Sequence, residues 1–139
     1  MAENYWYSNL KKEVEEKIRN VPDFPKEGIQ FKDITPLIKD ANLFEKLMSY
    51  YASTLSKNGI NKIVGVDARG FIFGSVLANK MGVPFVVARK AGKLPSKTVS
   101  YSYELEYGKA TVEMHIDDIK STDNVLVVDD LLATGGTVD

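Results

Sequence analysis

The 139-residue sequence contains no cysteine, only one histidine, and nearly equal numbers of acidic and basic residues. The lack of cysteine excludes disulfide bonds, thiolate metal sites and a cysteine nucleophile. With 18 basic and 19 acidic residues, the net charge of -1 provides no overall field that would attract nucleic acid or an anionic membrane. Recognition of an anion must therefore depend on local clusters of residues.

The sequence also lacks an apolar run of the roughly 18 residues that a transmembrane helix needs, and its N-terminus lacks the features of a signal peptide. We therefore expect a cytoplasmic protein that binds neither nucleic acid nor membranes. Hydrophobic residues make up 44% of the chain and charged residues 27%, which favours a single folded domain over a disordered chain.

Apolar periodicity predicts two helices in the first part of the chain. Residues 10–18 have the spacing of a short amphipathic helix, which residues 21–25 would end. Residues 43–55 form a stronger stripe, and residues 58–59 supply an Asn-Gly stop.

Strand patterns dominate the rest of the chain. Short apolar runs predict three strands, at 62–66, 84–88 and 124–128. A run of helical length lies between the first two strands, at 70–81. Because strand–helix–strand units pair in parallel, we predict an α/β fold with a parallel sheet flanked by helices. The continuous apolar run at 124–128 predicts a strand buried on both faces. Alternating residues between 99 and 116 predict an antiparallel hairpin.

Charged or glycine-containing turns follow the three predicted parallel strands, at 67–70, 89–90 and 129–130. In open parallel sheets, ligands bind just beyond the carboxyl ends of the strands. We therefore expect the three turns to lie together and to form one site.

The third turn combines two carboxylates with a phosphate-type loop, in the order Asp129, Asp130, Leu131, Leu132, Ala133, Thr134, Gly135, Gly136 and Thr137. The two glycines would let backbone N–H groups turn toward an anion, and the two threonines offer hydroxyls. The two aspartates suit sugar hydroxyls or hydrated Mg²⁺ but would repel phosphate. A sugar that bears a phosphate satisfies both halves.

This run resembles the phosphoribosyl pyrophosphate (PRPP) motif of type I phosphoribosyltransferases. Further segments resemble the adenine-specific members of that family in the same order, at 22–25, 28–36, 67–71, 89–95 and 101–110. The resemblance implies the type I phosphoribosyltransferase fold as one domain over 1–139. Within it, 1–36 would be a base-binding segment and 60–139 the core, with an antiparallel hairpin flap at about 90–116.

The resemblance also bears on where the sequence stops. The family fold continues after the phosphate loop with a helix and a further strand, whereas this sequence ends at Asp139. We therefore expect C-terminal elements to be missing, on the order of 40 residues. We also expect this chain to bind its substrates poorly and to turn over slowly.

The implied activity is a purine-salvage reaction. The family transfers the 5-phosphoribosyl group from PRPP to adenine, which gives AMP and pyrophosphate. The resemblance implies Mg²⁺ as the cofactor and a homodimer as the assembly. No dedicated protein ligands are expected for Mg²⁺, which the substrate would mainly hold. Positive charge would develop at C1 of the sugar while pyrophosphate leaves as an anion.

The resemblance assigns the PRPP contacts residue by residue. Asp129 and Asp130 would hold the ribose hydroxyls. The 5′-phosphate would bind to Ala133, Thr134, Gly135, Gly136 and Thr137. Pyrophosphate would bind to two loops, one formed by Asp67, Ala68, Arg69 and Gly70 and the other containing Arg89, Lys90 and Lys93. The family usually carries a non-proline cis peptide in the first loop. The alternative for the first loop is an ordinary strand-to-helix turn, and the alternative for the second is a solvated basic loop.

Glu106, beside Tyr107 of the flap, matches the family glutamate that exchanges a proton with the purine. Desolvation by the flap would raise the pKa of its carboxyl, as a general acid requires. Glu104 is the rival for this role, and a solvent-facing hairpin pair is the other alternative. Gln30, Phe31 and Lys32 would bind adenine, with Phe31 stacking on the ring unless it is a plain core residue. The single histidine, His115, has no metal constellation around it and is interpreted as structural.

Three other functions share some of these features. A receiver domain also ends a buried strand with two aspartates, but it needs that strand near its start. A DNA-binding regulator with a PRPP site would need an extra basic helical module. A transferase for hypoxanthine, guanine or xanthine would read a 6-oxo group with a side-chain donor.

Overall fold

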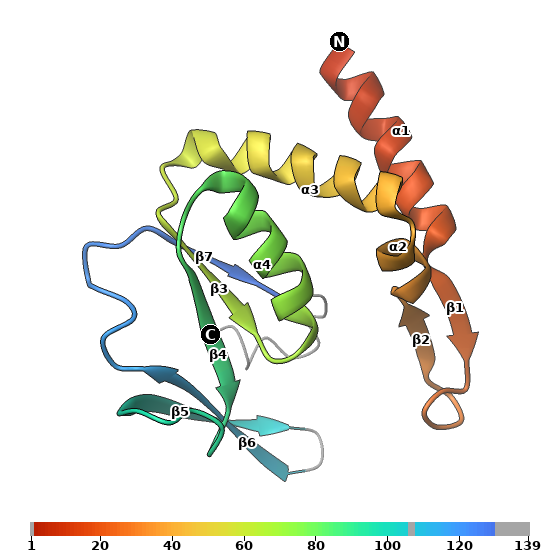
Figure 1. Ribbon diagram of the computed structural model, residues 1–139. Helices are drawn as coiled ribbons and strands as arrows, with labels where there is room; N and C mark the ends of the chain where they lie inside the picture. Colours follow the sequence, from red (N-terminus) through yellow and green to blue (C-terminus); the bar gives the residue numbers. More distant parts are fainter. Residues whose placement is uncertain (1, 106–107, 130–139) are drawn as a thin grey trace. The chain divides into compact units, whose positions relative to one another are not determined.

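The computed structural model describes residues 2–105 and 108–129 (Figure 1). The chain divides into two compact units, Met1–Tyr50 and Tyr51–Asp139. In the described part of the chain, no helix has both the length and the apolar character needed to cross a membrane.

The N-terminal unit contains helices and a two-stranded hairpin, in the order α1 (Ala2–Lys17), β1 (Arg19–Pro22), β2 (Gln30–Asp33), α2 (Thr35–Lys39) and the start of α3 (Ala41–Leu55). Both predicted helices are confirmed. However, the first ends at Lys17, before the predicted stop, because the chain goes directly into β1. Sequence patterns missed the antiparallel β1–β2 hairpin, in which Val21 pairs with Phe31.

Asp33 connects three parts of this unit. Its carboxylate accepts hydrogen bonds from the backbone N–H and hydroxyl of Thr35, at 3.0 and 2.6 Å, at the start of α2. It also pairs with the guanidinium of Arg19, which lies opposite it in the hairpin register. The Thr35 hydroxyl, the Thr35 N–H and Arg19 together lower the pKa of Asp33 from 3.8 to about 2.

The C-terminal unit is a mixed five-stranded sheet with helix α4 packed against it. Its elements after α3 are η1 (Ser56–Asn58), β3 (Lys62–Val66), α4 (Arg69–Met81), β4 (Phe85–Lys90), β5 (Thr98–Leu105), β6 (Gly108–His115) and β7 (Val125–Val128). The strand order is β5-β6-β4-β3-β7. β3 pairs in parallel with β4 and β7, whereas β6 pairs antiparallel with β4 and β5 (Figure 1).

The predicted strands and hairpin are therefore confirmed, with one correction. The strand predicted at 124–128 is β7, but it is not buried on both faces. It lies at the edge of the sheet formed by the described residues, and Val127 is 44% exposed. Leu126 and Val128 pack on the α4 side of the sheet, whereas the Val127 side chain, on the other face, is left exposed.

The core surrounds β3, which is buried on both faces. On one face, Ile63 packs against Leu77 and Ala78 of α4. On the other, Val64 and Val66 form a cluster with alternate residues of β4. Burial of this strand fixes the position of the turn that follows it.

We predict that Asp33→Asn lowers the stability of the protein at neutral pH but not at pH 2. The pKa of Asp33 is lower in the folded state than its ordinary value, so the carboxylate stabilises the fold above about pH 4. That contribution is lost as the pH falls toward 2. Urea unfolding of the wild type and the variant at several pH values measures the difference, and a gap that persists at pH 2 would contradict this account.

Candidate active site

The carboxyl ends of the three parallel strands lie side by side. In the register, Gly65 of β3 is opposite Val128 of β7, and Val66 is opposite Ala88 of β4. The backbone N–H of Asp67 donates to the carbonyl of Ala88 at 2.9 Å. The turns after β3 and β4 and the first residue after β7 therefore start at one edge of the sheet, as the sequence predicted.

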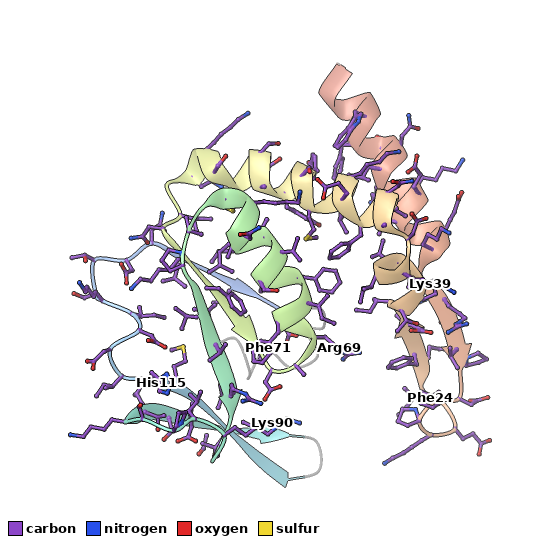
Figure 2. The ribbon with its side chains drawn as sticks, in the orientation of Figure 1. Phe24, Lys39, Arg69, Phe71, Lys90 and His115 are labelled. Atoms are coloured by element: carbon purple, nitrogen blue, oxygen red, sulfur yellow. The ribbon has the colours of Figure 1, made fainter. Side chains whose placement is uncertain are left out.

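The turn after β3 leads directly into α4. The peptide bond between Asp67 and Ala68 is cis, so the expected non-proline cis peptide is confirmed. Arg69 is the first residue of α4, and the N–H of Phe71 donates to the carbonyl of Ala68 at 3.1 Å. Figure 2 shows Arg69 and Phe71 at this end of the helix, with Lys90 at the end of β4. The amino end of α4 thus lies beside the carboxyl ends of the parallel strands.

Glycines allow α4 to approach the sheet this closely. A Cβ on Gly70 would lie 2.5 Å from the carbonyl oxygen of Val128 and 3.5 Å from the Cα of Asp129. Cβ atoms on Gly65 and Gly74 would meet the ring of Phe85 at 2.5 and 2.8 Å. Sequence reasoning did not assign Gly65 or Gly74, although small residues spaced four apart on α4, at 70 and 74, were a usable signal.

Asp67 gathers two cations around its carboxylate. The Nε of Arg89 and the Nζ of Lys93 each lie 3.5 Å from its Oδ2, and the Asp67 side chain is only 7% exposed. Burial raises the pKa of Asp67, but the Lys90 backbone N–H and the charges of Lys93 and Arg89 outweigh it and hold the pKa below its usual value. The carboxylate is therefore ionised at neutral pH and fixes the positions of both cations.

The Arg89 guanidinium is also held by an aromatic ring. Its central carbon lies 5.9 Å from the centroid of Phe71, within cation–π range. The Phe71 ring in turn contacts Phe85 edge-on, with centroids 6.1 Å apart. Phe71 was part of the motif read from the sequence but was given no role. Its position makes it a support for Arg89.

The predicted adenine-binding residues lie in β2 of the N-terminal unit. The ring of Phe31 packs edge-on against Phe24 at 5.2 Å between centroids, and Phe24 is 50% exposed. The side chain of Gln30 accepts a hydrogen bond from Asn20 Nδ2 at 2.9 Å, and Lys32 is exposed. Phe31 is therefore not enclosed in the core of its unit.

Several predicted site residues lie outside the described residues. These are Glu106, Tyr107, Asp130, Ala133, Thr134, Gly135, Gly136 and Thr137. Of Glu104, only the backbone pairing with Lys109 is described. The roles assigned to these residues stay predictions.

His115 lies at the end of β6, with its Nδ1 3.5 Å from a carboxylate oxygen of Asp118. Its Nε2 is buried and has no hydrogen-bond partner among the described residues. Within residues 2–105 and 108–129, no group of three or more His, Asp or Glu side chains could hold a metal ion. The structural role of His115 stays a prediction.

Known proteins resemble this chain in both sequence and structure. The phosphoribosyl transferase domain family matches residues 37–139. The adenine phosphoribosyltransferase of Mannheimia succiniciproducens is 51% identical over 126 residues, which cover 91% of this chain and 70% of that protein. The chain belongs to the adenine phosphoribosyltransferase family. Its reaction is the transfer of the 5-phosphoribosyl group from PRPP to adenine, which gives AMP and pyrophosphate.

Solved structures of adenine phosphoribosyltransferases have the same fold. The enzyme from Thermoanaerobacter pseudethanolicus matches with a TM-score of 0.86 and 50% identity, over 91% of this chain and 74% of that one. The Saccharomyces cerevisiae enzyme, in complex with an imino-altritol bisphosphate and adenine, matches with a TM-score of 0.89 and 39% identity, over 94% and 77%. The type I phosphoribosyltransferase fold is thereby confirmed.

We predict that Gly70→Ala destabilises the protein by about 1–3 kcal/mol, because the added methyl group meets backbone that cannot rotate away. Ser75→Ala, on the exposed side of the same helix, is the matched control and should change stability by less than about 0.5 kcal/mol. Urea unfolding measures both. Equal stability of the two variants would show that α4 does not need this close approach.

Proposed function

We propose that the pyrophosphate group of PRPP binds at the carboxyl ends of β3 and β4, beside the amino end of α4. The observation that carries this proposal is the pairing of Arg89 and Lys93 with the single carboxylate of Asp67. Lys90, next to Arg89 in the chain, is exposed. The three cations outnumber the carboxylates of Asp67 and Glu113 that contact this segment, so the cluster keeps a net positive charge. Such a cluster attracts an anion, and charge-assisted hydrogen bonds hold it strongly.

The turn between β3 and α4 would supply the uncharged contacts. Backbone N–H groups at the start of a helix have no partner within the helix, and the helix dipole favours an anion there. Ala68 and Gly70 occupy this position, and Arg69 is the first residue of the helix. We propose that the backbone of this turn and the Arg69 guanidinium bind the leaving pyrophosphate and stabilise its charge as the bond to C1 breaks.

Asp67 has a different role in this scheme. Its carboxylate would repel pyrophosphate, but it is nearly buried and occupied by Arg89 and Lys93. Asp67 would therefore contribute its backbone to the loop and use its side chain to position the two cations. This arrangement keeps the cations in place before the substrate arrives.

Mg²⁺ is proposed as the cofactor. The donor set fits a metal held mainly by oxygens of PRPP, because the nearest carboxylate of the cluster, that of Asp67, is already engaged by cations. Asp129, at the end of β7, is the described carboxylate that would lie near the ribose. When bound, Mg²⁺ would neutralise part of the negative charge of the departing pyrophosphate.

The remaining PRPP contacts follow the family assignment. We propose that Asp129 and Asp130 hold the ribose hydroxyls. The 5′-phosphate would bind to the backbone and hydroxyls of Ala133, Thr134, Gly135, Gly136 and Thr137. Holding both ends of PRPP leaves C1 as the atom that moves during transfer, so these contacts act chiefly by positioning.

Adenine is proposed to bind at β2, with its ring against Phe31 and its edge read by the backbone of Gln30 and Lys32. The partial exposure of the Phe24–Phe31 pair supports this role, since a stacking ring must be accessible. The yeast relative was solved in complex with adenine, which supports adenine as the base. Glu106 would exchange a proton with the purine, with Tyr107 covering it in the flap.

Assembly and location rest on family membership. We propose that the protein is a homodimer and that it acts in the cytoplasm. Sedimentation equilibrium gives the oligomeric state directly, and a monomer at assay concentration would contradict the dimer.

We predict that Lys90→Ala raises the KM for PRPP about tenfold, the cost of a lost charge-assisted hydrogen bond, and leaves the KM for adenine unchanged. Lys97→Ala is the matched control, because Lys97 is an exposed lysine in the loop that follows Lys90. It removes the same charge and should change neither constant. Pyrophosphate release measured against each substrate gives both constants, and equal effects of the two variants would place pyrophosphate elsewhere.

We also predict that Glu106→Gln lowers kcat by about 100-fold or more, within the range typical of a general acid, with little change in either KM. Glu104→Gln is the control, since it alters the same strand by the same chemistry. Steady-state kinetics of the two variants decide the assignment. A greater loss in Glu104→Gln would transfer the role to that residue.

A further inference from the structure

A second carboxylate, that of Glu113, contacts the segment between Lys90 and Thr98. It is a residue of β6, and in the β4–β6 register it is opposite Arg89. Its Oε1 accepts the backbone N–H of Gly92 at 2.6 Å, and its Oε2 accepts the hydroxyl of Thr98 at 2.8 Å. One carboxylate thus joins β6 to both ends of the loop between β4 and β5.

The segment that Glu113 holds is a tight turn. The N–H of Lys93 donates to the carbonyl of Lys90 at 3.3 Å, and Gly92 has a φ of +85°. A positive φ at the third residue of such a turn is typical of type II. The N–H of Ala91 donates to the carbonyl of Thr111 on β6 at 2.9 Å. Lys90 and Lys93 are therefore the first and last residues of a turn that β6 holds in place.

We propose that Glu113 is a positioning residue for PRPP, because it fixes the turn that presents Lys90 and Lys93 to the pyrophosphate group. The proposal rests on the pyrophosphate site proposed above. Asp67 orders the side chain of Lys93, and Glu113 orders the backbone between the two lysines. Neither carboxylate needs to touch the substrate for this purpose.

The charge of Glu113 agrees with this role. The Gly92 N–H and the Thr98 hydroxyl lower the pKa of its carboxyl below the usual value, against the opposing effect of burial. Glu113 therefore stays ionised at the pH of the reaction, and both oxygens remain acceptors. The groups that donate hydrogen bonds to it come from the β4–β5 loop and from the start of β5.

The test compares four variants by pyrophosphate-release kinetics. Glu113→Ala should raise the KM for PRPP about tenfold, with the KM for adenine unchanged, since one charged acceptor is lost. Glu113→Gln keeps an oxygen for the Gly92 N–H and should stay within about threefold of the wild type. Ser102→Ala is the matched control. It removes the 2.8 Å hydroxyl pair with Thr111 from the same hairpin but no contact of the turn, and should change neither constant.

Glu113→Asp covers the case in which Glu113→Ala does not fold. It keeps the charge but shortens the side chain, so it should also raise the KM for PRPP. Amide hydrogen exchange adds a readout that does not depend on activity: the Gly92 amide should exchange faster in Glu113→Ala and Glu113→Asp than in Glu113→Gln.

Two results would overturn the proposal in distinguishable ways. If Lys90→Ala weakens PRPP binding while folded Glu113→Ala and Glu113→Asp do not, the pyrophosphate site stands and Glu113 has no positioning role. If neither Lys90→Ala nor the Glu113 variants affect PRPP, the pyrophosphate site itself is wrong, and the role of Glu113 fails with it.

Discussion

The close approach of α4 to β3 and β7 is the constraint on which the candidate active site depends. Gly70 lies against the carbonyl of Val128, and Gly65 and Gly74 leave room for the ring of Phe85. No residue with a Cβ fits at these positions without movement of the backbone or ring. This packing brings the amino end of α4 to the carboxyl edge of the sheet, where the strand ends supply the charged residues.

Carboxylates then organise the cations at that edge. The buried Asp67 holds Arg89 and Lys93, and Glu113 holds the turn between Lys90 and Lys93. Without these contacts, the basic side chains would sample many positions in solvent. Binding of pyrophosphate would then include the entropic cost of ordering the loop. Acidic residues are thus compatible with the proposed pyrophosphate site, because they contact the cations and would leave the substrate to N–H groups.

Much of this arrangement could be predicted from the sequence because its signals are local. The strand predicted at 62–66 is β3 residue for residue, and the alternation between 99 and 116 gave the β5–β6 hairpin, with Val99 opposite Met114. The β1–β2 hairpin was missed because its strands have four residues each and little alternation. The burial predicted for 124–128 was wrong because apolar character does not tell an edge strand from a central one. Glu113 was missed because its partners, Gly92 and Thr98, are distant along the chain, and in the sequence it is one more polar residue of an alternating strand.

An amide chemical-shift titration can show whether pyrophosphate binds at the proposed site. The ¹⁵N-labelled protein would be titrated with inorganic pyrophosphate and Mg²⁺. The amide shifts would be compared between the carboxyl ends and the amino ends of the parallel strands. The account predicts that the largest changes fall on the amides of 67–70 and 90–93, and that Asn61 and Asn124, at the opposite ends of β3 and β7, do not move. Saturable shifts centred on Asn61 and Asn124, with 67–70 unaffected, would contradict it.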